Sequence, residues 1–398
     1  MLTAIQSAKV VFFADIIYIP NYIFYFCPFN CREMILEKLS VLNYKNILQA
    51  ELSFSPKVNC FFGNNGMGKT NLLDSIHYLS FCKSHAYTPD TQIIRSGEDL
   101  CVIQGSYAYE GHAEEIFCAL RRRQRKQFKR NKKEYEKLSD HIGLLPLVIV
   151  SPDDSELIKG GSEERRRFID LIISQQDKHY LYALIQYNKA LTQRNVLLKE
   201  QSSDVGLFEV LEIQLQLYGQ QVYEKRQALI QDFLPIFNEY YQIISGAVEQ
   251  VGLRYVSHLE TNNLEEVLRA NRDRERVLGY TSMGVHNDEL EMTLEGALIR
   301  RIGSQGQNKS YLIALKLAQF AFLKRRGLTT PILLLDDIFD KLDADRVAQI
   351  IHLVNGDQFG QIFITDTNRK YLDEILAAMP HDYRLFEVER GEVRLMEE

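Results

Sequence analysis

Tryptophan is absent from the chain, which by itself decides nothing, and cysteine is scarce, with six residues among 398. All six cysteines lie in the first third of the sequence, at Cys27, Cys31, Cys60, Cys82, Cys101 and Cys118. The sequence contains no C-x-x-C pair and no spaced Cys/His set, so it offers neither the ligand pattern of a zinc site nor the framework of a disulfide-stapled domain. We therefore expect reduced thiols that are buried or half-buried.

The chain also lacks a net positive charge. Its formal net charge is −6, so the total does not indicate a polyanionic partner, although the distribution of charge matters more than the sum. With 45% hydrophobic and 25% charged residues, the composition is that of an ordinary soluble protein of two or three domains.

A clean membrane segment is missing as well. Residues 10–29 form an apolar and aromatic run of 20 residues, long enough to raise the question of a membrane span. However, Asp15, Pro20 and Asn21 interrupt the run, and no basic start or small-residue cleavage site marks it as a secretory signal. We interpret residues 1–33 as an extension from a mis-assigned start, outside the fold, and expect no membrane association.

From Met34 the sequence is strand-rich, and a helical region follows it. Alternating and short apolar runs predict strands up to 62, a helix over 70–80 and further strands up to 150. The region 162–270 has helical periodicity, with Ser162 at a capping position, a turn at 201–206 and Pro235 expected to kink or break the second long helix. After 285 the α/β pattern returns. We predict a head built from 34–150 and 280–398, and a helical arm over 151–279.

The stretch "CFFGNNGMGKTNLLDSI" (60–76) fits the G-x-x-x-x-G-K-[ST] pattern between a strand and a helix. Its glycines let backbone N–H groups turn toward an anion at the positive start of the helix. Lys69 would reach the β- and γ-phosphates, and the Thr70 hydroxyl would bind Mg²⁺. The predicted ATP-binding residues are Gly63, Asn64, Asn65, Gly66, Met67, Gly68, Lys69 and Thr70.

The stretch "PILLLDDIFDKLD" (331–343) is an apolar strand that ends in paired carboxylates. On its own, such a strand end is most often solvated, but beside a phosphate loop it becomes a Walker B element. We predict that Asp336 binds the Mg²⁺ shell and that Asp337 polarises the attacking water. Lys69 and Asp336 are 267 residues apart, so the site would be assembled from the two ends of the chain.

The stretch "GSQGQNK" (303–309) opens a predicted helix. A simple N-cap explains Ser304 equally well, but a free hydroxyl and N–H groups at a helix start also form an anion site. A phosphate loop together with a second phosphate-facing helix start suggests two subunits, one supplying the loop and the other Ser304, Gln305, Gly306 and Gln307.

These motifs resemble an ABC-type ATPase head, with "KLD" as the D-loop that ends in Asp343 and a helical arm inserted as in the SMC-like branch. Within that branch the chain resembles the RecF family of recombination-mediator ATPases. The resemblance covers most of 34–398 and rests on the two anion-binding stretches above, their flanks and four further blocks: "NYKN" (43–46), "SPDDSELIKGGSEERRRFID" (151–170), "YNKALTQRNVLLK" (187–199) and "GVHNDEL" (284–290).

The resemblance implies an α/β head with an α-helical arm, and ATP and Mg²⁺ as cofactors. It also implies an ATP-dependent homodimer in the cytoplasm that binds single-stranded or gapped DNA and has weak, switch-like, DNA-dependent ATPase activity. RecO and RecR would be its partners in recombinase loading, replication-fork maintenance and SOS induction. The chain departs from the family at Val285, Asn287 and the run Asn308–Lys309–Ser310, where Pro, Arg and Gln-Arg-Thr are typical, so a role for Asn287 is in doubt.

The run "RRRQRKQFKRNKK" (121–133) has nine Lys or Arg in thirteen residues and no acid. It is either a solvated charged hairpin or a surface for sequence-independent phosphate contact. The candidate DNA contacts are Arg121, Arg122, Arg123, Arg125, Lys126, Lys129 and Arg130, to which the cluster Arg165–Arg167 could add.

Two other functions share some of these motifs. The cytosolic ATPase subunit of a membrane transporter would have the same loop, signature and Asp strand, but only a short helical subdomain. A small-molecule kinase would need a substrate pocket and lid and would not explain "SQGQ".

Overall fold

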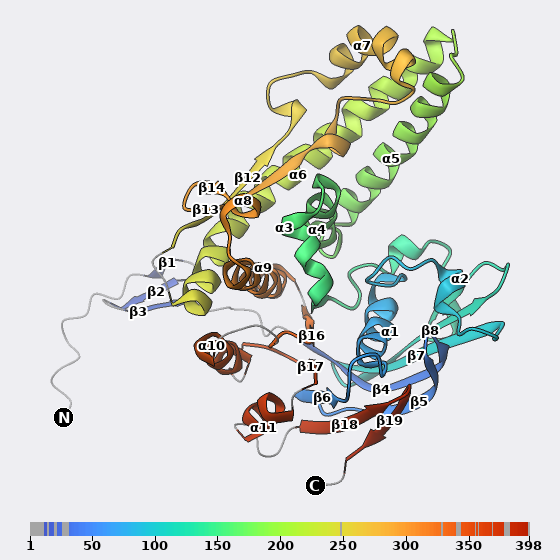
Figure 1. Cartoon of the computed structure of the whole chain (residues 1–398). Helices are drawn as coiled ribbons and strands as arrows, with labels where there is room; N and C mark the ends of the chain where they lie inside the picture. The colour runs from blue at the N-terminus through green and yellow to red at the C-terminus, as the bar shows by residue number, and fades with distance from the viewer. Residues whose placement is uncertain are drawn as a thin grey trace.

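The computed structural model has a head built on β-sheets and a long helical arm that rises from it (Figure 1). It describes residues 12–13, 16–19, 22–25, 32–246, 249–327, 329–339, 344–354, 356, 358–367, 369–377 and 383–396.

Six strands form the central sheet of the head, in the order β11-β16-β17-β6-β18-β19. Neighbouring strands from β11 to β18 are parallel, and β19 is antiparallel. The carboxyl ends of β6 and β16 therefore lie at the same edge of the sheet, with only β17 between them. The bounds are β6 (Val58–Phe62), β11 (Leu147–Val150), β16 (Ile332–Asp336), β17 (Ile362–Asp366), β18 (Tyr383–Glu389) and β19 (Glu392–Leu395).

A second sheet has the order β10-β9-β8-β7-β4-β15. The first two residues of β4 pair with β15, and residues 38–44 of β4 pair with β5. Its strands are β4 (Arg32–Tyr44), β5 (Ile47–Ser53), β7 (Leu100–Tyr109), β8 (His112–Arg121), β9 (Gln127–Arg130), β10 (Lys133–Glu134) and β15 (Thr329–Thr330). β4 begins two residues before the expected start of the fold, because Arg32 and Glu33 pair with Thr329 and Thr330.

Helix α1 (Lys69–Phe81) lies between the two sheets of the head. It contacts β4 and β7 of the second sheet as well as β16 and β17 of the central sheet. Because both faces are covered, almost the whole helix is buried rather than a single stripe. The helix that starts at the glycine-rich loop is therefore held by both sheets.

The arm contains α3 (Glu156–Lys159), α4 (Ser162–Ser174), α5 (Lys178–Lys199), α6 (Val205–Ser245) and α7 (Leu264–Leu278). Helices α5 and α6 pack as an antiparallel hairpin, and the lower part of α6 packs against α9 (Gln305–Arg326) at the head (Figure 1). The side chains of Asp177 and Asp204 cap the starts of α5 and α6 by accepting backbone N–H groups.

Three expectations for the arm were wrong in whole or in part. Of the kink or break expected at Pro235, the break does not occur: helix α6 continues through this residue, with buried neighbours such as Phe233 and Phe237 packing on either side of it. The region expected to be helical contains a strand, β12 (Val251–Val256), which pairs with β13 (Glu289–Leu294) next to β14 (Ala297–Leu298). Ser162 lies inside α4, whose N-cap is Gly161, and makes no capping bond.

The remaining elements are short connections and peripheral helices. Strands β1 (Phe12–Phe13), β2 (Ile16–Ile19) and β3 (Tyr22–Tyr25) form a sheet of their own. Within the part of the chain that is described, no helix is long and apolar enough to span a membrane. The other bounds are α2 (Asp90–Ile93), α8 (Ile299–Ile302), α10 (Ala344–Val354) and α11 (Arg369–Ala377), with 3₁₀ turns η1 (Leu138–Asp140), η2 (Pro152–Ser155), η3 (His258–Glu260) and η4 (Val285–Asn287).

The expectation of reduced thiols is confirmed for the four described cysteines. Cys60, Cys82, Cys101 and Cys118 are buried and free. Burial disfavours the thiolate and raises the pKa of Cys82 and of Cys101 to about 12. These thiols therefore behave as small apolar side chains.

Asp74 anchors α1 to the loops around it. Its carboxylate accepts hydrogen bonds from the Tyr44 hydroxyl at 2.7 Å, the Ser84 hydroxyl at 2.7 Å and the His85 backbone N–H at 2.6 Å. The Lys45 ammonium lies 2.6 Å from the same carboxylate. Burial favours a raised pKa of Asp74, but the charge of Lys45 and these hydrogen bonds outweigh it, and the pKa is lowered. The block "NYKN" (43–46) and the residues that directly follow α1, "CKSH" (82–85), thus hold this helix in place.

We expect Asp74→Ala to lower the free energy of unfolding by about 3–5 kcal/mol, because it leaves the Lys45 charge largely buried and unpaired. The lowered pKa means that Asp74 stabilises the fold above its unfolded-state pKa, and that this stability is lost as the pH falls through its folded-state pKa. Urea unfolding at neutral and acid pH measures both effects. The control is Asp99→Ala, whose side chain is 95% exposed, with an expected change within about 0.5 kcal/mol. Equal effects of the two variants would contradict the assignment.

Candidate functional site

The loop Gly63–Thr70 connects β6 to α1, as the sequence predicts. Gly63 and Gly68 have φ angles of 155° and 116°, a backbone conformation that residues with a side chain rarely adopt. A Cβ at Gly63 would collide with the carbonyl oxygen of Val388, and one at Gly68 would lie 2.9 Å from the side-chain amide of Asn46. The glycines are therefore required both by the backbone turn and by close neighbours from two other parts of the chain.

Lys69 folds back onto this loop. Its ammonium donates to the carbonyl oxygens of Gly63 at 2.6 Å and of Asn64 at 3.1 Å, and the residue is 6% exposed. Burial lowers the pKa of Lys69, and the carboxylates of Asp337 and Asp336 offset part of this effect. A phosphate bound in the loop would compete with the two carbonyls for the ammonium, because charge-assisted bonds to anions are stronger.

The structure brings Thr70 and Asp336 together from positions 266 residues apart. The Thr70 hydroxyl donates to the Asp336 carboxylate at 3.1 Å, and the Thr365 hydroxyl donates to the same oxygen at 2.6 Å. Asp336 is 2% exposed, and burial raises its pKa even though both hydroxyls stabilise the charged form. A hydroxyl and a carboxylate at this distance form the oxygen pair that Mg²⁺ accepts.

Asp337 lies next to this pair in an unusual backbone conformation. Its φ angle is 49°, and its N–H donates to the backbone and side-chain oxygens of Thr365, each at 3.1 Å. Its side chain therefore leaves the line of the strand and borders a hollow of about 350 Å³. Asp336, Ser151 and Ser155 also line this hollow, together with Gln305 from the start of α9.

Sequence reasoning missed Thr365 and Ser151. Thr365 is fully buried at the end of the apolar run "IFIT", and a polar side chain in such a run is the signal that could have identified it. Ser151 follows β11, whose Val150 is paired with Leu335, so the chain enters the arm next to Asp336. The pairing of strands distant in sequence creates both positions, and motif spacing does not reveal them.

Ser304 is the N-cap of α9, and it forms a capping box with Gln307. The Ser304 hydroxyl accepts the Gln307 N–H at 3.2 Å, and the Gln307 side chain accepts the Ser304 N–H at 2.9 Å. Ser304 is exposed, and neither it nor Gly306 is among the described residues lining the hollow beside Asp337. The helix start is thus capped within its own chain, and Gln305 borders the hollow while Ser304 and Gly306 are not among its described lining residues. Asp343, predicted as the D-loop residue, lies outside the described residues.

The basic run spans the end of β8 and the whole of β9, and its charges are not equivalent. Arg121, Arg123 and Arg125 are exposed, whereas Lys126 and Arg130 are engaged within the head. Lys126 lies 3.0 Å from the Asp90 carboxylate and donates to the Cys82 carbonyl at 2.7 Å. Arg130 forms a two-pronged pair with Glu114, with both bonds at 2.8 Å.

Two further basic residues and the aromatic ring of the run also have local partners. Arg122 donates to the Glu98 carbonyl at 2.9 Å, and Lys129 lies 5.7 Å from the centre of the Phe117 ring. Phe128 is 1% exposed, so it cannot stack on a base. The free positive charge is therefore concentrated at the tip of the hairpin, before β9.

The cluster Arg165–Arg167 is largely structural. Arg165 forms a buried pair with Glu289 at 2.6 Å, and Arg166 donates to the Asp288 carbonyl at 2.8 Å. Arg167 pairs with Glu163 and Glu164 on its own helix. These contacts join α4 to β13, so they hold the base of the arm rather than form a free basic patch.

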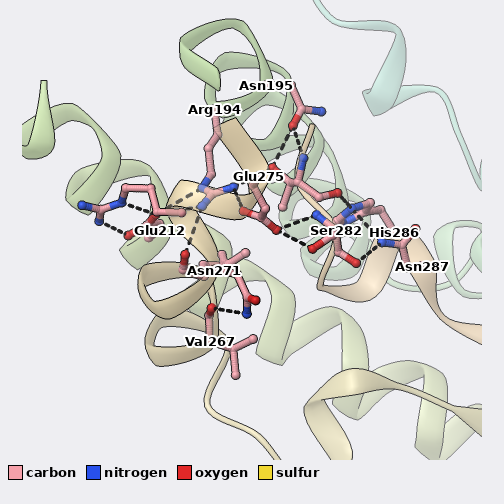
Figure 2. A network of polar contacts seen from close by, with 12 residues as sticks. Arg194, Asn195, Glu212, Val267, Asn271, Glu275, Ser282, His286 and Asn287 are labelled. Carbon is pink, nitrogen blue, oxygen red and sulfur yellow. Dashed lines mark hydrogen bonds and ion pairs between the residues drawn. The ribbon is translucent and has the colours of Figure 1, made fainter. Parts of the chain in front are cut away.

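The remaining blocks of the resemblance meet in the arm, where Figure 2 shows Arg194, Glu212 and Glu275 pointing toward one another. Arg194 is fully buried and pairs with Glu212 at 2.9 Å and with Glu275 at 2.6 Å. Asn287 donates to the Ser282 carbonyl at 2.8 Å nearby. These residues tie α5, α6 and α7 to the loop before β13, so their contacts are structural.

The glycine-rich loop between a buried strand and a helix, the aspartate pair beside it and the inserted helical arm define the class. The chain has the head of an ABC-type P-loop ATPase of the SMC-like kind.

A family model described as the RecF/RecN/SMC N terminal domain matches residues 35–392. A protein of Parabacteroides distasonis described as DNA replication and repair protein RecF is 76% identical over 365 residues, 92% of this chain and 100% of that protein. A protein of Bacteroides fragilis with the same description is 60% identical over 367 residues, 92% of this chain and 99% of that protein. The chain therefore belongs to the RecF family, and the predicted family is confirmed.

Solved structures confirm the predicted fold class. The recombination mediator protein RecF in the RecFOR pathway, solved with ATPrS, aligns with a TM-score of 0.82 at 26% identity, over 92% of this chain and 100% of that chain. The Smc head domain of Pyrococcus furiosus, with an extended coiled coil and bound to part of ScpA, aligns with a TM-score of 0.55 at 17% identity, over 91% of this chain and 96% of that chain. This second likeness shows the shared fold alone.

We expect Asp336→Asn to raise the melting temperature of the nucleotide-free protein at pH 7. Because burial raises the pKa of Asp336, its ionisation above the unfolded-state pKa costs stability, and asparagine removes this cost while still accepting both hydroxyls. The difference should shrink as the pH falls toward the range where Asp336 is protonated. Differential scanning calorimetry across pH measures it, with the exposed Asp373→Asn as control. A lower melting temperature for Asp336→Asn at pH 7 would contradict the raised pKa.

Proposed function

We propose that this protein binds ATP and DNA in recombinational repair and at replication forks, as a member of the RecFOR pathway in the cytoplasm. The observation that carries the proposal is the contact between Thr70 and Asp336 at the edge of the central sheet, which assembles a nucleotide site from two distant motifs. The solved RecF structures with ATP and ATPrS support it by likeness. The long α6 and the RecF relatives favour this function over a transport ATPase.

The nucleotide would bind against the loop Gly63–Thr70, with its phosphates facing the start of α1. Lys69 would leave the carbonyls of Gly63 and Asn64 for the β- and γ-phosphates. Thr70 and Asp336 would hold Mg²⁺, which neutralises phosphate charge when bound. Asp337, beside the hollow, would orient and polarise the attacking water.

Closure would require two copies. Ser304 and Gly306 of one copy would close on the nucleotide held by Lys69 of the other, with Gln305, Gln307 and the D-loop residue Asp343 nearby. Ser304 and Gly306 are not among the described residues that line this chain's own hollow, which supports contact in trans. ATP would then drive dimerisation, and hydrolysis would open the dimer, so we expect slow, DNA-stimulated turnover that acts as a switch.

DNA would bind through phosphate contacts at the tip of the basic hairpin. Arg121, Arg123 and Arg125 are exposed there and suit sequence-independent binding of single-stranded or gapped DNA. RecO and RecR would be its partners in recombinase loading and SOS induction, a proposal that the description of solved RecF as a recombination mediator in the RecFOR pathway supports. Lys126 and Arg130 would contribute less, because Asp90 and Glu114 already neutralise them.

We expect Lys69→Ala to weaken ATP binding about 10- to 100-fold, because it removes charge-assisted bonds to phosphate, and to abolish ATP-dependent dimerisation. Ser304→Arg should leave ATP binding by the monomer intact but block the dimer. Fluorescent-nucleotide titration and light scattering with ATPγS separate the two effects. A full ATPγS-induced dimer of Lys69→Ala would overturn the loop assignment.

We expect replacement of Arg121, Arg122, Arg123 and Arg125 by alanine to weaken DNA binding and to flatten its salt dependence. On duplex DNA the log–log slope should fall by about 0.9 for each phosphate that the variant no longer neutralises. Anisotropy titrations with gapped and duplex DNA in ATPγS over a salt series measure this effect. The matched control replaces four exposed arginines elsewhere, Arg254, Arg269, Arg325 and Arg326. If the hairpin variant binds with unchanged affinity, the DNA site lies elsewhere.

A further inference from the structure

The guanidinium of Arg346 packs against the first turn of α9, the helix that starts after Ser304. Arg346 belongs to α10, and its Nη1 atom would be 2.5 Å from a Cβ built on Gly306. A side chain at position 306 would push this guanidinium aside, so the glycine lets it lie against the start of the helix. Gly306 is thus in close contact with Arg346, which lies outside all of the sequence motifs.

A cation at this place is unfavourable unless an anion accompanies it. The start of α9 carries the positive end of the helix dipole, and its first N–H groups have no acceptor within the helix. A guanidinium beside it adds charge of the same sign. The arrangement concentrates positive potential at the exposed Ser304–Gly306 surface.

In this single chain, Glu249 provides part of the compensation. The pKa of Glu249 is lowered by hydrogen bonds from Tyr241 at 2.6 Å and Gln307 at 2.8 Å, and further by the charge of Arg346. One carboxylate therefore faces both the helix start and the arginine. A group with more negative charge, such as a terminal phosphate, would be held more strongly at the same surface.

We infer that Arg346 binds the γ-phosphate of the ATP held by a second copy of this chain, beside Ser304 and Gly306. The inference rests on the proposed function, in which the signature closes the nucleotide site in trans. The planar guanidinium can offer two parallel N–H bonds to phosphate oxygens, which suits it to this role better than lysine. Arg346, like Gly306, is not among the described residues lining its own chain's hollow at Asp337, which agrees with a contact made across the dimer.

The first test uses Arg346→Ala and Arg346→Lys. Both variants should bind ATPγS as monomers with wild-type affinity, measured by fluorescent-nucleotide titration at low protein concentration. ATPγS-induced dimerisation, measured by light scattering, should weaken about 10- to 100-fold for alanine and less for lysine. The control is Arg326→Ala, an exposed arginine at the other end of α9, which should dimerise as the wild type does. Wild-type dimerisation by Arg346→Ala would overturn the inference.

The second test mixes subunits. A mixture of Lys69→Ala subunits with Arg346→Ala subunits forms a heterodimer with one intact composite site. ATPase activity and the dimer should therefore exceed those of either variant alone, since Lys69→Ala lacks them and Arg346→Ala has them only weakly. Such rescue also excludes misfolding, because the Arg346→Ala subunit must supply a working loop. A second mixture, of Lys69→Ala with Ser304→Arg subunits, tests the composite site without changing Arg346. It too should regain ATPase activity and the dimer.

The outcomes distinguish a failure of the Arg346 contact from a failure of the composite site. Rescue with Ser304→Arg but not with Arg346→Ala would show that Arg346 acts within its own subunit or only on folding, and would overturn this inference alone. Absence of rescue in both mixtures, or of any ATPγS-induced dimer of the wild type, would overturn the proposed composite site and this inference with it.

Discussion

The hydrogen bond from the Thr70 hydroxyl to the Asp336 carboxylate depends on the strand order of the central sheet. Thr70 is in the first turn of α1, directly after the glycine-rich loop, and Asp336 ends β16, so the bond forms only because β6 and β16 end at one edge with β17 between them. β17 is more than a spacer, because its Thr365 donates to the same carboxylate and its backbone oxygen accepts the Asp337 N–H. Two hydroxyl groups thereby stabilise the buried carboxylate, together with the nearby charge of Lys69. Burial outweighs them and disfavours ionisation in the free protein, which a bound cation would favour.

The arm is braced by buried charges that are paired. Arg194 meets Glu212 and Glu275 near its outer end, and Arg226 meets Asp170 and Asp288 at its base. Replacing one member of such a network leaves its partner buried and uncompensated, so each pair specifies one packing of the helices. These buried pairs therefore join α4, α5, α6 and α7 at two levels of the arm.

The parts of the molecule that depend on local sequence could be predicted, and those that depend on strand order could not. Gly63–Thr70 and the strand ending at Asp336 were recognisable because a phosphate loop and a buried strand each need only consecutive residues. Thr365 was missed because its role comes from its neighbours in the sheet. β12 was missed because a six-residue strand between two helical segments has little periodicity of its own. The sequence also did not reveal which basic residues of the hairpin have acidic partners. Asp90 pairs with Lys126 and Glu114 pairs with Arg130, and both acids come from other elements.

The unbroken helix through Pro235 gives the arm mechanical leverage. Forty-one residues in one α-helix span about 60 Å, and the end of α6 nearest the head packs against α9. A rotation of α9 by about 5° would therefore displace the far end of α6 by about 5 Å, given that length. A small rotation at α9 that carried α6 with it would thus be amplified at the tip of the arm, because displacement grows with distance from the pivot.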